Sequence, residues 1–299
     1  MIEDIEKYHV AGSISGGKDS CAMWLHLREM GVEIDPVFMD TGWESDATYI
    51  YLDRLEDYFG TEIKRISDPG PALTEETAPV VERFEKMVGR RSSMVRWIVH
   101  KGTFPSRGRR WCTQQLKIAP MKLYLDSIED AEPLNAVGIR AEESVKRAAL
   151  PVFEYSEKWK CDVWRPVHGF TFADVVDIHS RHGLEPCDLY LDGAKRLGCW
   201  PCIYACKSEL RTIGRRDQKR VATLRAMEEW LTEKKNAKRG WFQNRRDQTD
   251  GTPWHIDEVL TWANTSRGGR QPELFTAHKR DRGCMDWGLC DTGGGSDEA

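Results

Sequence analysis

Short apolar runs alternate with amphipathic segments along the first half of the chain. Four runs have the length and composition of buried strands, at residues 8–14, 34–39, 62–67 and 134–139. Two segments between them, 19–30 and 46–59, have the apolar spacing of helices that pack on a sheet. Strands that alternate with helices are typical of a parallel sheet covered on both faces. The pattern therefore predicts an α/β fold with a doubly wound, mostly parallel sheet.

The pattern changes near residue 215. Residues 217–235 have helical periodicity with many charges, and residues 256–263 predict a short helix that carries Trp262. A glycine run at 293–295 predicts a frayed end. We therefore divide the chain into a domain over 1–215 and a basic, mainly helical extension over 216–299. Its tryptophans would either stack on bases or, as is more common, cover the helices: Trp241, Trp254 and Trp287.

Length and composition limit the classes of protein. A chain of 299 residues can bury the core of one large domain with an appendage. No run approaches the roughly 18 apolar residues that a membrane span needs, and the acidic N-terminus does not resemble a signal peptide. We therefore expect a cytoplasmic protein. In that compartment nine cysteines indicate metal or redox chemistry rather than disulfides.

The net charge of −4 conceals two basic blocks. Residues 83–117 carry ten Lys or Arg against Glu85 alone, and residues 207–246 carry thirteen against five acidic residues. In the first block Trp97, Phe104 and Trp111 stand among the arginines, a composition that suits phosphates and stacked bases. The second block is equally consistent with an ordinary solvated helix surface. The first block thus predicts contact with a polyanion, either a nucleotide or a nucleic acid.

The segment Ser15-Gly16-Gly17-Lys18-Asp19-Ser20 lies between a predicted strand and a predicted helix. Adjacent glycines let backbone N–H groups face a ligand, and the positive end of the following helix adds to them. Lys18 supplies a charge and the serines supply hydroxyls. Asp19 would repel phosphate unless it orients a neighbour or helps to hold Mg²⁺. The segment predicts a phosphate-binding loop.

Further polar residues follow the other predicted strands. Asp40, Thr41 and Gly42 follow the strand at 34–39, and Gly138, Arg140 and Arg147 lie at or beyond the end of the strand at 134–139. In a doubly wound sheet, ligands bind beyond the carboxyl ends of the strands. We therefore expect one crevice that gathers four charged side chains: Lys18, Asp19, Asp40 and Arg140.

The loop sequence resembles at every position the signature of the PP-loop ATP pyrophosphatase superfamily, whose fold is of the adenine nucleotide alpha hydrolase type. Within it the chain is similar to the phosphoadenosine phosphosulfate (PAPS) reductase family. The similarity rests on Met39-Asp40-Thr41-Gly42, on the Gly-x-Arg-x-x-Glu-Ser-x-x-Arg-Ala segment at 138–148, and on Trp164-Arg165-Pro166-Val167. It spans about residues 8–215. The resemblance implies that the loop grips the β,γ-pyrophosphate of ATP and leaves the α-phosphorus open to attack.

Four cysteines form the candidate metal site. Cys199-Trp200-Pro201-Cys202 is a C-x-x-C, a spacing that rarely serves packing alone. In cluster-bearing relatives such a pair joins a cysteine that precedes a Leu-Lys-x-x-Pro segment, here Cys112 before residues 116–120, to hold a 4Fe-4S cluster. The fourth ligand would be Cys206, but the chain lacks the tandem Cys-Cys of adenylylsulfate reductases, so Cys284 and Cys290 compete with it. Zinc is the competing metal. Three isolated cysteines are expected to be buried: Cys21, Cys161 and Cys187.

The resemblance implies an enzyme with ATP, Mg²⁺ and a cluster as cofactors. True sulfonucleotide reductases carry a Glu-Cys-Gly-x-His motif, which is absent here; the nearest segment is Gly288-Leu289-Cys290-Asp291. The intact loop favours ATP-dependent adenylation in sulfur transfer to nucleic acid, as in DNA phosphorothioation proteins and tRNA thiolases, with a sulfur donor protein as a further partner. Alternatives are a reductase that uses Cys290 or Cys284, an ATP sulfurylase-like subunit, and a non-enzymatic nucleotide-binding partner protein.

Overall fold

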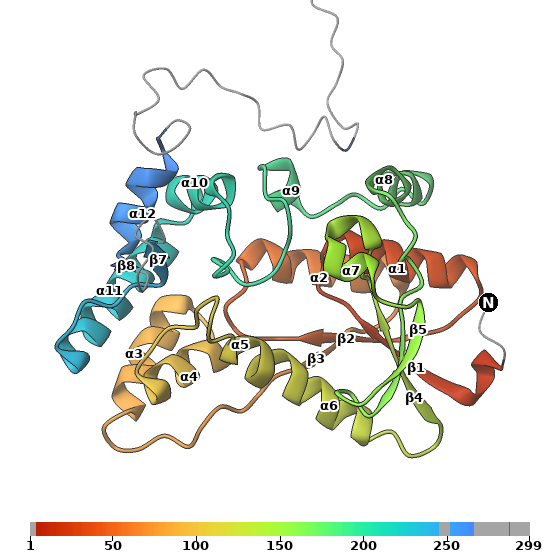
Figure 1. Cartoon of the computed structure of the whole chain (residues 1–299), viewed down its shortest axis with the longest axis horizontal. Coiled ribbons are helices and arrows are strands. Elements are labelled where there is room, and N and C mark those ends of the chain that lie inside the picture. The colour runs from red at the N-terminus through yellow and green to blue at the C-terminus, as the bar shows by residue number, and fades with distance from the viewer. Residues whose placement is uncertain (1–3, 245–251, 266–286, 288–299) are drawn as a thin grey trace, which may run out of the picture.

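The computed structural model describes residues 4–244, 252–265 and 287. Their centre is a six-stranded sheet with the strand order β3-β2-β1-β4-β6-β5 (Figure 1). The strands are β1 (Tyr8–Ser13), β2 (Asp35–Met39), β3 (Lys64–Ile66), β4 (Glu132–Val137), β5 (Phe153–Ser156) and β6 (Cys161–Trp164). Only β5 at one edge runs antiparallel to its neighbour. The predicted doubly wound, mostly parallel sheet is confirmed.

Helices cover both faces of the sheet. In Figure 1 α1 (Lys18–Glu29) and α2 (Asp46–Phe59) lie above it, and α6 (Ala119–Asp126) lies below. Successive residues of β1 face opposite layers, because side chains alternate along a strand. Val10 joins the main core with the buried face of α1, whereas Ala11 packs with Met121 and Leu125 of α6.

Further helices and short helical turns lie before residue 192. They are the 3-10 turns η1 (Ile5–Lys7) and η3 (Ala141–Glu143), the π-helical turn η2 (Gln114–Ile118), and the helices α3 (Ala78–Val88), α4 (Ser93–Lys101), α5 (Trp111–Thr113), α7 (Val145–Ala148), α8 (Phe172–Arg181) and α9 (Asp188–Leu191). Four of the ten basic residues of the first block thus lie on α3 and α4, two helices that the sequence pattern did not predict. The β5–β6 hairpin was not predicted either.

The C-terminal part contains α10 (Lys207–Arg216), α11 (Gln218–Lys235), α12 (Ile256–Ala263) and a small hairpin of β7 (Phe242–Asn244) and β8 (Thr252–Trp254). The two predicted helices of this region are confirmed as α11 and α12. Apolar residues of α11 such as Leu224 and Met227 are part of the main core, and α11 packs against α3. The boundary near residue 215 stays a prediction.

Candidate functional site

The loop at residues 15–20 lies where the strand order reverses direction. From β1 the chain proceeds to β2 and β3 on one side, and β4 then returns to pair with the other side of β1. Ser13 at the end of β1 is opposite Val137 at the end of β4. Doubly wound sheets bind ligands at such a switch point, beyond the carboxyl ends of the strands. The loop and the segment after β4 therefore both lie at the switch point, where such folds bind ligands.

Hydrogen bonds of the loop's own serines fix its shape. Gly16 has a φ of +71°, a conformation that L side chains rarely adopt. The N–H of Gly17 donates to Ser15 Oγ at 3.2 Å, and Ser20 Oγ donates to the carbonyl of Gly17 at 2.8 Å. Ser20 Oγ also accepts from the N–H of Ser15 at 3.2 Å. Both hydroxyls, predicted as phosphate contacts, therefore hold the loop backbone in this structure.

Two residues that the sequence analysis missed secure the start of α1. The N–H of Lys18 donates to the hydroxyl of Tyr190 in α9 at 3.1 Å. His179 of α8 is buried, with Nε2 at 3.0 Å from the carbonyl of Lys18 and Nδ1 at 3.1 Å from that of Leu184. Burial lowers the pKa of His179 despite these two carbonyls. Neither residue stands in a recognisable motif, so no signal in the sequence pointed to them.

Asp19 joins the loop to the segment after β4. One of its carboxylate oxygens accepts from Lys18 Nζ at 2.5 Å, and the other accepts from Arg140 Nε at 2.6 Å. Arg140 is only 4% exposed, and it also pairs with Glu142. Burial alone would lower the pKa of Arg140, but Asp19 and Glu142 together outweigh that effect and the pKa is raised. Of the roles predicted for Asp19, the orientation of neighbouring cations is the one this geometry matches.

Gly138 permits this contact between segments. A Cβ atom at Gly138 would lie 2.6 Å from the carbonyl oxygen of Asp19 and 2.8 Å from the Cα of Ser20. Real side chains do not approach so closely, so only glycine lets the end of β4 lie against the loop. Arg147, the last predicted residue of this segment, lies on α7 and forms an ion pair with Glu143 instead of Asp19.

The turn after β2 forms a separate polar network. Asp40 Oδ1 accepts from the N–H of Gly42 at 2.8 Å and from the hydroxyl of Tyr49 at 2.6 Å. Gly42 has a φ of +64°, and a Cβ there would lie 2.3 Å from the backbone of Arg91. Asp40 makes no direct contact with Lys18 or Arg140 among the interactions of the described residues. The structure thus brings Lys18, Asp19 and Arg140 together, with Asp40 at the end of the neighbouring strand.

A buried carboxylate, Glu44, holds this turn together and was also missed. It is 1% exposed and accepts from Thr41 Oγ1 at 2.7 Å and from the N–H of Trp43 at 3.1 Å. The N–H of Trp200 donates to the carbonyl of Trp43 at 2.9 Å. Residues 43–44 and 199–200 therefore lie side by side, although 150 or more positions separate them in the sequence. Glu44 directly follows the predicted Asp40-Thr41-Gly42-Trp43 turn, so its position could have been noticed.

Three of the four predicted metal ligands line one cavity of about 240 Å³. Cys112 comes from α5, and Cys199 and Cys202 come from the segment between α9 and α10. Cys206 is the first residue before α10, and its Sγ lies 3.0 Å from Ser208 Oγ. The cysteines predicted to be isolated, Cys21, Cys161 and Cys187, are buried as expected. Cys284 and Cys290 lie outside the described residues.

Lys117 also lines this cavity and gives it a positive charge. Burial acts to lower the pKa of Lys117, but the acidic groups around it, with Cys199 and Glu44 contributing most, together outweigh burial, and the pKa is raised. Burial raises the pKa of Cys199 to about 12, although Lys117 acts in the opposite direction. Burial also raises the pKa of the Cys112 thiol. Without a metal, burial thus favours the protonated form of both thiols.

No group of three or more His, Cys, Asp or Glu side chains in residues 4–244, 252–265 and 287 has the arrangement of a metal-ion site. In the same part of the chain, no helix has the length and apolar character needed to cross a membrane. The predicted cluster and the predicted cytoplasmic location stay predictions.

Comparison with known proteins places the chain in a family. The model of the phosphoadenosine phosphosulfate reductase domain matches residues 9–205, so the chain belongs to this family. An uncharacterized protein of Escherichia phage 186 is 32% identical over 89% of this chain and 91% of its own length. An uncharacterized protein of Methanocaldococcus jannaschii is 27% identical over 79% of this chain but only 45% of its own length.

Solved structures resemble the chain more loosely. A phosphoadenylyl-sulfate reductase from Candida auris, in a phosphate complex, is 17% identical over 64% of this chain and 81% of its own, with a TM-score of 0.47. The U34-tRNA thiolase from Methanococcus maripaludis with its [4Fe-4S] cluster is 15% identical over 86% and 81%, with a TM-score of 0.33. These values are too low to assign a substrate or cofactor.

Proposed function

We propose that this chain is an ATP-dependent enzyme that adenylates an acceptor during sulfur transfer, with a nucleic acid as the acceptor. The observation that carries the proposal is the intact loop at the switch point, in which Asp19 links Lys18 to the buried Arg140. Cations that are already oriented cost little reorganisation when charge develops in a transition state. The cysteine cavity of the same molecule supports the sulfur-transfer part of the proposal.

The chemistry would take place at the α-phosphorus of ATP. An oxygen of the acceptor attacks this phosphorus, the bond to the β-phosphate oxygen breaks, and pyrophosphate leaves. The loop and the helix end of α1 hold the β,γ-phosphates, and Lys18 and Arg140 stabilise the negative charge. Sulfur at the oxidation level of hydrosulfide then attacks the adenylated carbon or phosphorus, and AMP leaves with the former acceptor oxygen. No net oxidation or reduction occurs.

Of the two predicted carboxylates, Asp19 and Asp40, Asp40 is the better candidate to bind a magnesium ion. Both oxygens of Asp19 are engaged by Lys18 and Arg140. The two hydrogen bonds to Asp40 both go to Oδ1. We therefore assign Asp40 as the carboxylate with an oxygen for Mg²⁺, a hard cation that prefers such ligands.

The cysteine cavity fits a thiolate-bound metal in its donor chemistry. Cys112, Cys199 and Cys202 line it, and Cys206 is four residues beyond Cys202. Four thiolates suit either an iron–sulfur cluster or zinc. When bound, a cluster would supply a site that holds sulfide. The positive charge of Lys117 at the cavity wall would favour the deprotonated thiols that metal binding requires.

Pyrophosphate release from ATP tests the proposal. Anaerobically purified protein should release pyrophosphate only when DNA or tRNA is added. Lys18→Ala should lower the rate by about a hundred-fold, since it removes a charge that stabilises the transition state. Lys158→Ala, an exposed lysine in the turn between β5 and β6, removes the same charge and should leave the rate unchanged. Release that needs no nucleic acid, or no release together with thioredoxin-dependent turnover of PAPS, would contradict the proposal.

A further inference from the structure

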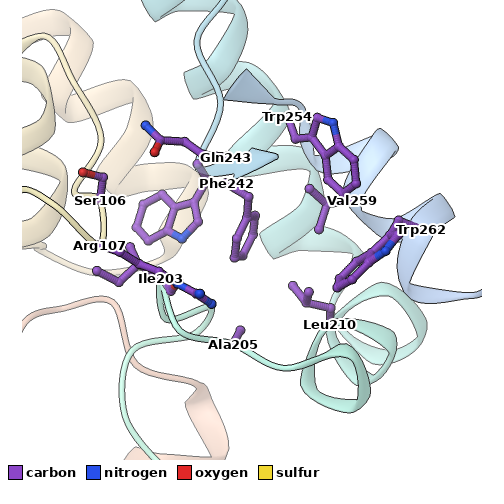
Figure 2. Close-up of a pocket in the computed structure, with 11 residues that line it drawn as sticks. Ser106, Arg107, Ile203, Ala205, Leu210, Phe242, Gln243, Trp254, Val259 and Trp262 are labelled. Carbon is purple, nitrogen blue, oxygen red and sulfur yellow. The ribbon is translucent and has the colours of Figure 1, made fainter. Parts of the chain in front are cut away.

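A second cavity, of about 370 Å³, lies between the C-terminal part of the chain and residues 106–107, and neither the loop at residues 15–20 nor the four candidate cysteines line it (Figure 2). Figure 2 shows Trp254, Val259 and Trp262 on one side and Ser106, Arg107 and Ile203 on the other, with Phe242 between them. Four of the lining side chains are aromatic. The volume falls in the range of small-molecule sites, which are mostly apolar with a few polar groups.

The aromatic walls are held in place by neighbours outside the cavity. Trp241 is 2% exposed, and its ring stacks on Trp43 at a centroid distance of 5.1 Å. Trp254 and Trp262 meet edge to face at 5.8 Å, and Lys207 Nζ lies 4.4 Å from the ring centre of Trp262. The cavity therefore presents fixed aromatic surfaces.

Polar groups distinguish this cavity from a packing defect. The indole N–H of Trp241 is buried and has no hydrogen-bond partner among the described residues. Buried polar groups are normally paired, and this donor without a partner belongs to a residue that lines the cavity. Gln243 adds an exposed amide, which can both donate and accept. A flat, polar-edged ring is the kind of group that such walls accommodate.

A cluster of arginines lies beside the cavity, around Tyr204. The guanidinium carbons of Arg107, Arg110 and Arg196 lie 5.2, 5.3 and 5.7 Å from the centre of the Tyr204 ring. All three arginines are exposed, and within the described part of the chain none of them pairs with a carboxylate. Arg96, by contrast, pairs with Glu85. Three adjacent unpaired cations on a chain of net charge −4 mark a surface for more than one phosphate.

The two cavities share a wall. Ile203 and Ala205 line both the aromatic cavity and the cysteine cavity. Arg107 lines the first, whereas Arg110, Arg196 and Tyr204 line the second. The arginine cluster thus lies at the boundary between an aromatic pocket and the cysteines.

We propose that the aromatic cavity binds one unstacked base of a single-stranded nucleic acid, with the adjoining phosphates on Arg107, Arg110 and Arg196. Aromatic side chains stack on any base, and a basic groove follows the backbone. The role of this strand as the acceptor rests on the function proposed above, whereas the binding itself does not require ATP. Bases in a duplex are already stacked, so the same sequence as a duplex should bind more weakly.

Binding of short fluorescent oligonucleotides to the full chain, measured by anisotropy at several salt concentrations, tests the inference. Arg107→Ala should lower the slope of log affinity against log salt by about 0.7, the value for one phosphate contact on a single strand. Trp262→Ala should weaken binding roughly 5-fold to 100-fold without changing that slope, because it removes stacking rather than charge. Trp262→Phe should restore most of the affinity. Lys158→Ala, at the far edge of the sheet, should change neither quantity.

The outcomes separate this inference from the proposed function. Lys18→Ala should lower the rate of pyrophosphate release about a hundred-fold and leave oligonucleotide binding intact, so either proposal can fail while the other holds. Equal binding of Trp262→Ala and the unchanged protein, with both folded by circular dichroism, would overturn the inference. So would equal affinity for duplex and single strand, or competition by a free mononucleotide at the concentration of the oligonucleotide.

Discussion

At the residue scale, the missing side chain of Gly138 sets how closely β4 approaches the phosphate loop. Gly138→Ala should displace the backbone of Asp19 and Ser20, because its Cβ would lie within 2.8 Å of both residues. Overpacking of this kind costs about 1–3 kcal/mol. We expect lower stability in urea and a larger loss of ATP affinity, measured by calorimetry.

Gly108→Ala is the matched control for this substitution. A Cβ at Gly108 has no neighbour within 4 Å, and the φ of Gly108 is not in the left-handed region. The control should keep both stability and ATP affinity. If Gly138→Ala behaves like the control, the loop can relax without cost and the contact with β4 does not position it.

Some contacts of the site could be predicted from the sequence, and others could not. The approach of Lys18, Asp19 and Arg140 could be predicted, because the ends of parallel strands meet at one edge of the sheet. The contacts of Tyr190 and His179 with Lys18 could not be predicted. These two residues lie on α9 and α8, and neither belongs to a repeating pattern in the sequence. Which of the two predicted carboxylates pairs with arginine also depends on side-chain geometry that spacing does not encode.

At the scale of elements, Glu228 joins α11 to the C-terminal hairpin and α12. Its two oxygens accept from the N–H groups of Trp241 at 3.0 Å and Ile256 at 2.8 Å. Burial raises the pKa of Glu228 from 4.5 to about 7, and the charges of Asp257 and Glu258 act in the same direction. The two N–H groups act against this effect without cancelling it.

This raised pKa predicts a pH dependence of stability. Between pH 4.5 and about 7 the folded carboxyl keeps a proton that the unfolded chain has lost, so the free energy of unfolding falls as the pH rises. The total fall is about 3 kcal/mol, and it ends above the folded pKa. Urea unfolding at a series of pH values measures it. Glu228→Gln should remove this component, and an unchanged pH profile in that variant would contradict the assignment.

The elements themselves were predictable to different degrees. The strands β1 to β4 and the helices α1, α2, α11 and α12 follow from clear apolar periodicity. The hairpin of β5 and β6 has four-residue strands, and Phe153 and Tyr155 on β5 are exposed, so it lacks the buried alternation that identifies a strand. The helices α3 and α4 lie within the first basic block, and we read that block for its charge and not for the apolar face that residues such as Phe84 and Ile98 form.

At the scale of the whole molecule, the loop at residues 15–20 and the cysteine cavity are neighbours. A Cβ on Gly16 would lie 3.8 Å from Leu197, which lines the cysteine cavity. The segment from α9 to α10 therefore contacts the loop through Tyr190 and Leu197 and then supplies Cys199 and Cys202. Nucleotide binding and metal binding should thus each stabilise the same segment. From the sequence we could predict that the loop and the cysteines belong to one domain, but not how far apart they lie.

The proposed metal centre gives a test that uses the whole chain. After anaerobic reconstitution with iron and sulfide, we expect Ser substitution of any one ligand to remove more than half of the bound iron and acid-labile sulfide. The substitutions are Cys112→Ser, Cys199→Ser, Cys202→Ser and Cys206→Ser. Cys187→Ser is the control, because this buried thiol donates to the carbonyl of Ala47 and lies outside the cysteine cavity.

Cys206 must leave Ser208 to serve as a ligand, so its variant is the decisive one. Full iron content in Cys206→Ser alone would show that the fourth ligand comes from elsewhere, and full iron content in all four variants would contradict the centre itself.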